Sequence, residues 1–274
     1  MQHKRWNVLI SLISALFLMG LYGCNKSTNS NNNNTNPPPP PIGKLVYDDY
    51  AYDTINIGTQ TWTVANARVT HYGGVAANLI PYLQTGNLWN TNTKANPILG
   101  ARTYWGTGGG GTDVSHAEYN KFNPIFGALY NFAAASDPRI APPGWRVPSK
   151  ADFERLIAYV TAINGNSADM VAYHLKLDKG KGFQGVEDGS WNWYNGSKEG
   201  DNATGFSAIP GGEINESGIY SGVGSTAIFR STTVDGGAPN NAYCLFLEDK
   251  TSKAIIKSLP NKSGYSIRFV KDKQ

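Results

Sequence analysis

Five consecutive prolines, Pro37 to Pro41, follow a stretch of asparagine, serine and threonine that begins near Asn25. Neither segment carries enough apolar side chains to bury a hydrophobic core. The proline run predicts a polyproline II spacer, roughly 15 Å long at about 3.1 Å per residue. We therefore expect residues 24–43 to form a tether and the folded domain to occupy residues 44–274.

The composition indicates a loop-rich domain of the kind found outside the cytoplasm. The chain holds 31 glycines in 274 residues, with 12% aromatic and only 16% charged residues. The low charge argues against a disordered or coiled-coil body. Abundant glycine and aromatic residues favour short strands joined by turns. The net charge of +4 gives no reason to expect nucleic-acid binding.

The first 23 residues are organised like a bacterial lipoprotein signal peptide. Basic residues 3–5 precede the apolar run 6–21, which is shorter than the roughly 20 apolar residues that a transmembrane helix needs. The run ends at Leu21-Tyr22-Gly23-Cys24, which resembles the lipobox whose cysteine becomes the lipidated N-terminus. A plain signal peptide with an incidental cysteine is the alternative interpretation.

Lipidation would have two consequences. The mature chain would be anchored through Cys24 to a membrane of the cell envelope, for which we expect the outer membrane, with surface exposure left open. Cys244 would then be the only remaining thiol, which excludes an intramolecular disulfide and a cysteine zinc site. Its apolar neighbours predict a buried, inert side chain.

Several segments carry clear secondary-structure signals. Residues 52–57 and 60–64 alternate around Gly58-Thr59, which predicts a β-hairpin. A capping-box variant at Ser149 and Asp152 precedes an apolar stripe, which predicts a helix that ends at Asn164. The remaining expectations are a shorter helix over 168–177 and four strands over 227–231, 242–248, 254–259 and 266–271.

Seven short motifs occur in order along the chain. They are Ile57-Gly58-x-Gln60-x-Trp62 with Asn66, and the segments 126–132, 143–148, 204–212, 229–232, 241–243 and 264–270. Together they resemble the Fibrobacter succinogenes major paralogous domain family, which is common in lipoproteins of Bacteroidetes. The resemblance implies an α+β, C-type-lectin-like fold in which two helices flank small twisted antiparallel sheets with long loops. It also implies that Ala141 and Phe269 replace a disulfide of the family.

Aromatic and amide side chains mark two candidate ligand-binding segments. A glycine-flanked loop holds Trp191, Trp193 and Tyr194, and aromatic rings of this kind stack on sugar faces. Packing of alternate rings into the core is the alternative. The resemblance implies a second ligand face in the C-terminal strands, formed by Arg230, Thr232, Asn240, Asn241 and Tyr243. A role in the framework of the domain is the alternative.

Catalysis and metal binding have less support in the sequence. Only His71, His116 and His174 follow the signal peptide, and none lies in a nucleophile or zinc motif, so we do not expect an enzyme. The calcium-ligand triplets of C-type lectins are absent. The acidic residues in 187–188 and 199–202 are better explained as solvated loop charges, so calcium remains possible but unsupported and no cofactor is expected.

The sequence therefore predicts a cell-envelope lipoprotein that displays a non-catalytic binding domain. Recognition of a glycan or a protein, as in adhesion, is the preferred function. An accessory or tip subunit of a surface appendage or envelope complex is the alternative, and an enzyme is third.

Overall fold

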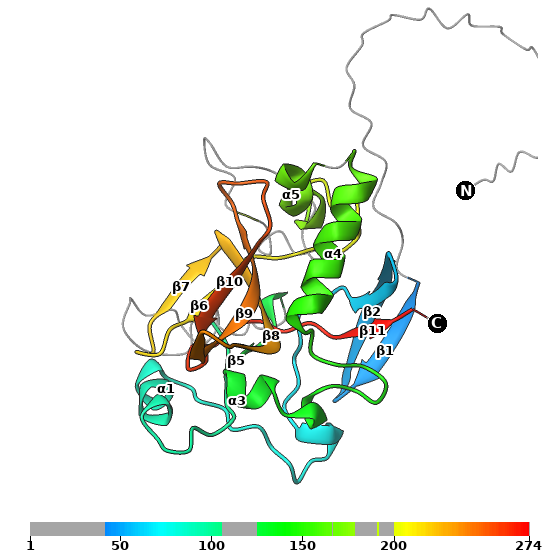
Figure 1. Ribbon diagram of the computed structural model, residues 1–274. Coiled ribbons are helices and arrows are strands. Elements are labelled where there is room, and N and C mark those ends of the chain that lie inside the picture. Colours follow the sequence, from blue (N-terminus) through cyan, green and yellow to red (C-terminus); the bar gives the residue numbers. More distant parts are fainter. Residues whose placement is uncertain (1–41, 106–124, 166, 179–190, 192–199, 274) are drawn as a thin grey trace, which may run out of the picture. The chain divides into compact units, whose positions relative to one another are not determined.

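The computed structural model describes residues 42–105, 125–165, 167–178, 191 and 200–273. Within these residues the chain forms four antiparallel sheets, and α4 is the only helix longer than eight residues (Figure 1). The strands are β1 (Gly43–Tyr47), β2 (Tyr50–Ile57), β3 (Gln60–Thr63), β4 (Arg102–Thr103), β5 (Leu129–Tyr130), β6 (Gly211–Ile214), β7 (Tyr220–Val223), β8 (Thr226–Asp235), β9 (Ala238–Glu248), β10 (Ile255–Pro260) and β11 (Val270–Asp272). The helices are α1 (Gly86–Thr93), α3 (Phe132–Ala135), α4 (Lys150–Ile163) and α5 (Val171–Leu175), with 3-10 turns at Tyr72–Gly74, Pro138–Ile140 and Ala168–Met170.

The first sheet has the strand order β1-β2-β3-β11. Its β2–β3 hairpin confirms the predicted hairpin, and the turn uses Gly58 at a positive φ of 61°. A side chain at Gly58 would also meet the Tyr159 ring of α4, since an added Cβ would lie 2.8 Å from it. The C-terminal strand β11 pairs with β3, with Val270 opposite Trp62, so the two ends of the folded domain share one sheet.

Helix α4 begins and ends where its sequence signals predict. Ser149 and Asp152 form a complete capping box, in which each side chain accepts a hydrogen bond from the other residue's backbone N–H. The predicted apolar stripe is buried at Phe153, Leu156 and Val160. Phe153 stacks on Trp62 of β3 at 5.9 Å between ring centroids, which fixes the helix against the first sheet.

The longest strands form the second sheet, β10-β9-β8. The predicted strands over 227–231, 242–248 and 254–259 are confirmed, but β8 and β9 extend to 10 and 11 residues and pair along most of their length. Of the predicted strand over 266–271, only residues 270 and 271 lie in a strand, β11 of the first sheet. Helix α4 contacts both of them, and Figure 1 shows α4 lying between this sheet and β1-β2-β3-β11.

The expected α+β, C-type-lectin-like architecture with two helices flanking small sheets is wrong. The described chain is mostly β, with four sheets and mostly short helices. The second predicted helix over 168–177 is a 3-10 turn followed by the five-residue α5, and Ser167 makes no side-chain cap. The amide of Ala172 donates to Ser252 O at 2.7 Å, so tertiary contacts take the place of helical turns in this segment.

The core is apolar but holds several unusual polar side chains. Ala141 and Phe269, for which the family resemblance implies the replacement of a disulfide, are both buried in the main hydrophobic cluster. Arg268 is fully buried and donates to Asn66 Oδ1 and to the backbone oxygens of Phe206 and Ser207. No helix among the described residues is long and apolar enough to cross a membrane.

Candidate ligand-binding groove

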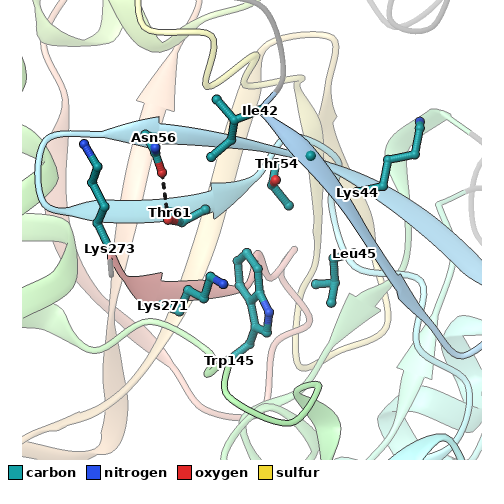
Figure 2. Close-up of a pocket in the computed structure, with 10 residues that line it drawn as sticks. Ile42, Lys44, Leu45, Thr54, Asn56, Thr61, Trp145, Lys271 and Lys273 are labelled. Carbon is teal, nitrogen blue, oxygen red and sulfur yellow. Dashed lines mark hydrogen bonds between the residues drawn. The ribbon is translucent and has the colours of Figure 1, made fainter.

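A groove of about 380 Å³ lies on one face of the first sheet (Figure 2). Direct pairing of Asn56 with Thr61 and of Thr61 with Lys271 places these three side chains on that face. The opposite face carries Trp62 and Val270 into the core. The groove is lined by Ile42, Gly43, Lys44, Leu45, Thr54, Asn56, Thr61, Trp145, Lys271 and Lys273.

Trp145 forms one wall of the groove. It ends a tight turn in which its amide donates to Pro142 O at 2.9 Å and Gly144 adopts a positive φ of 78°. The next residue, Arg146, exchanges two backbone hydrogen bonds of 2.9 Å with Val270, which attaches the turn to β11. The indole is therefore held beside the sheet and stays partly exposed.

The side chain of Arg146 fixes this turn to α4. Its guanidinium contacts Asp152 at 2.7 Å and Asp272 at 3.1 Å. Arg155 contacts the same two carboxylates at 2.6 and 3.1 Å. Burial by itself would raise the pKa of Asp152, but hydrogen bonds from Arg146, Ser149 and Arg155 outweigh it and hold that pKa well below its usual value.

The floor of the groove presents hydrogen-bond donors. Thr61 Oγ1 donates to Asn56 Oδ1 at 2.8 Å, which occupies the amide oxygen (Figure 2). The Nδ2 group of Asn56 makes no hydrogen bond to another described residue. Its two N–H donors are therefore available to a ligand in the groove.

Among the residues that the structure describes, three lysines and no acidic residue line the groove. Lys44 is paired with Asp53 at 2.8 Å, whereas the ammonium of Lys271 lies 5.0 Å from the Trp145 ring centroid. Neither Lys271 nor Lys273 pairs with a carboxylate in the described part of the chain. The groove therefore combines an aromatic surface with positive charge.

A second cavity of about 280 Å³ shares Trp145 with the groove. Its lining includes Asp137, Arg146 and Thr232. Thr232 is one of the predicted ligand residues, and its amide donates to Pro148 O at 2.8 Å. Trp145 thus lines two hollows of the surface.

Two of the predicted ligand residues lie in the interior. Trp191 is 1% exposed, and its Nε1 donates to Ala208 O at 2.9 Å. Arg230 is 0% exposed, donates to Pro260 O and Ser263 O, and lies 4.4 Å from the Tyr265 ring centroid. Side chains that are buried from solvent cannot contact a ligand, so neither residue belongs to the binding surface.

The other predicted residues are placed apart from the groove or are not described. Asn240 is exposed and Asn241 and Tyr243 are partly exposed on β9. The Tyr243 hydroxyl donates to Asp235 Oδ1 at 3.1 Å, and the Tyr243 ring centroid lies 4.5 Å from the ammonium of Lys150. Trp193, Tyr194 and the lipidation site Cys24 lie outside the described residues.

Two histidine–carboxylate pairs, His71 with Asp48 and His174 with Asp201, lie among the described residues. Thr70 Oγ1 and Asp48 Oδ1 both contact the same nitrogen, Nδ1 of His71, at 2.8 and 2.9 Å. A relay needs the hydroxyl and the carboxylate on different ring nitrogens, so this cluster does not form one. His174 Nδ1 lies 3.0 Å from both oxygens of Asp201, and neither histidine lines the groove.

A metal site is not evident in the part of the chain that the structure describes. No group of three or more His, Cys, Asp or Glu side chains is positioned there to hold an ion. Of the acidic loop residues considered for calcium, Asp201 pairs with His174, and 187, 188 and 199 lie outside the described residues.

The sequence contained signals for this groove that ligand-residue reasoning missed. Lys271 and Lys273 are two residues apart on an extended segment, which places them on the same face. Trp145 lies within the motif 143–148, which indicates the family but by itself no ligand. Trp145 and the two lysines come together because the Trp145 turn contacts β11, and no local sequence pattern predicts that contact.

Residues 55–271 match the model of the Fibrobacter succinogenes major domain. This match confirms the family that the seven motifs suggested. It includes the groove residues Asn56, Thr61, Trp145 and Lys271. No curated protein and no solved structure matches the chain.

Proposed function

The chain belongs to the Fibrobacter succinogenes major domain family, and on this premise we propose that it is a lipid-anchored envelope protein with a non-catalytic, glycan-binding domain. The single observation that carries the binding proposal is the composition of the groove. A partly exposed indole stands beside free amide donors on a sheet face. Sugars offer a C–H face to an aromatic ring and hydroxyl groups to amides.

The rigid support of Trp145 favours binding over a packing role for its exposed surface. The turn is attached to β11 through backbone hydrogen bonds and to α4 through Arg146. A ring held in this way loses little conformational freedom when a ligand stacks on it. A protein partner, including an envelope complex in which the chain is an accessory subunit, is the competing proposal.

The anchoring proposal rests on the sequence of the N-terminal segment. A basic segment, an apolar run and Gly23-Cys24 stand in the order of a lipoprotein signal. Ile42, the residue that directly follows the proline run, lines the groove. The first residue that the structure describes therefore lies at the proposed ligand site.

Binding of the full chain, purified in detergent micelles, to a broad glycan array tests the function. We expect chelator-insensitive binding that Trp145→Ala weakens by about tenfold or more. Tyr173→Ala is the matched control, because Tyr173 is a partly exposed aromatic residue on α5 and does not line the groove. Absence of any glycan ligand, or equal loss in both variants, contradicts the proposal and directs the search to protein partners.

A further inference from the structure

We propose that the groove selects anionic glycans, whose sugar rings carry carboxylate or sulfate groups. The inference deepens the proposed glycan-binding function and rests on it. It is carried by the placement of charge around Trp145 rather than by the aromatic ring itself.

In the segment 271–273, the two lysine side chains lie on one face and the aspartate side chain lies on the other. Lys271, Asp272 and Lys273 are consecutive, and side chains alternate between the two faces of a strand. Asp272 contacts Arg146 and Arg155 at 3.1 Å each, away from the groove lining. Lys271 and Lys273 line the groove. The one carboxylate of this segment is therefore neutralised elsewhere, and both ammonium groups face the ligand site.

No carboxylate in the described groove lining neutralises the charge of Lys271 or Lys273. Lys44 is matched by Asp53 at 2.8 Å, but the lining contains no Asp or Glu for Lys271 or Lys273. The free donors of Asn56 add to the same preference, because an N–H group binds an oxygen acceptor. Carboxylate and sulfate oxygens accept from both kinds of donor.

The contact between Lys271 and Trp145 fits a ligand that has both an apolar face and an acidic group. The ammonium lies 5.0 Å from the ring centroid, and such a contact is weak where solvent reaches it. A charge-assisted hydrogen bond to an acidic group is stronger, so Lys271 can turn to the ligand. The sugar ring then stacks on the indole while its acidic group reaches the lysine.

The second cavity indicates that the ligand is longer than one sugar. Trp145 lines both hollows, and the second one contains Arg146, Thr232 and Asp137, whose carboxylate is paired with Arg139 at 2.6 Å. A chain of several sugars can occupy both sides of the Trp145 turn, whereas a single sugar occupies one.

Paired probes that differ only in charge test the inference. The full chain is titrated with oligogalacturonides and their methyl esters, and with a sulfated oligosaccharide and its desulfated form. We expect the acidic member of a pair to bind about tenfold tighter or more. The double variant Lys271→Gln/Lys273→Gln should lose this difference while keeping its thermal midpoint.

A charge-matched control separates the site from general electrostatics. Lys94→Gln/Lys250→Gln removes the same charge from exposed lysines outside the groove and should retain the preference. Equal, Trp145-dependent binding of acidic and neutral glycans overturns the inference but leaves the proposed function standing. No glycan binding at all overturns both. Equal binding of poly-glutamate assigns the site to acidic peptides and overturns the glycan assignment.

Discussion

The guanidinium of Arg146 lies 2.7 Å from the carboxylate of Asp152, and this contact joins the Trp145 turn to the first turn of α4. Asp152 also completes the capping box with Ser149 and contacts Arg155 at 2.6 Å. One buried carboxylate therefore starts the helix and positions the wall of the groove. Stability and ligand binding should depend on it together.

Asp152→Asn should lower the free energy of unfolding by about 2 kcal/mol at neutral pH, since a cap and two charged hydrogen bonds are weakened. The pKa of Asp152 lies below its usual value in the folded state. The folded state therefore binds fewer protons than the unfolded state, and this contribution is lost as the pH falls below about 4. The difference in free energy of unfolding between wild type and Asp152→Asn, measured with urea, should therefore become smaller toward acid pH.

The exposed Asp169 supplies the control for this prediction. It pairs with Lys253 at the surface, with side-chain exposures of 70% and 58%. Asp169→Asn should change the free energy of unfolding by less than about 0.5 kcal/mol. If the free energy of unfolding of Asp152→Asn differs from that of wild type by the same amount at neutral and acid pH, the pKa of Asp152 is not lowered in the folded state.

Local sequence signals predicted the local parts of the fold. The β2–β3 hairpin follows from alternation around a glycine turn, and α4 follows from the Ser149–Asp152 box. The length of β8 and β9 did not follow, because Asp235, Pro239 and Asn240 are residue types that strands disfavour. Their pairing partners supply that structure.

The candidate site was harder to predict from the sequence, because it also depends on contacts between distant segments. Trp191 and Arg230 have the composition of binding residues, but burial depends on contacts with distant segments such as Ala208 and Ser263. Trp145 and Lys271 are 126 positions apart, yet both line the groove. The backbone pairing of Arg146 with Val270 and the ion pair of Arg146 with Asp272 bring them together.

Trp191→Ala should destabilise the domain by about 3 to 4 kcal/mol, because it removes a buried ring and leaves a cavity. Trp145→Ala should cost less than about 1 kcal/mol, because its ring is partly exposed. Thermal unfolding of the two variants gives the comparison. An unchanged midpoint for Trp191→Ala, with ligand binding lost, would return Trp191 to the ligand site.

Lys176 should make stability rise with pH in the alkaline range. Burial lowers its pKa to about 8, against the opposing influence of Asp249 and Glu248. Between about pH 8 and the ordinary lysine pKa near 10.4, the unfolded state binds more protons, so the free energy of unfolding increases with pH.

Lys176→Met lacks this titration but shares the tyrosines that ionise in the same range. The difference in free energy of unfolding, wild type minus variant, should therefore grow from about pH 8 to about pH 10 in urea titrations. A difference independent of pH would mean that Lys176 keeps an ordinary pKa in the folded state.

The two cysteines allow a direct test of the membrane anchor. Cys24→Ala should release the protein from the membrane fraction and abolish incorporation of labelled palmitate, because it removes the proposed lipidation site. Cys244→Ala should stay in the membrane fraction with its label. Cys244 is buried in the domain, and burial raises the pKa of its thiol to about 11, so it is a poor nucleophile. Retention of Cys24→Ala in membranes that resist high salt would refute the lipid anchor and favour an uncleaved signal segment.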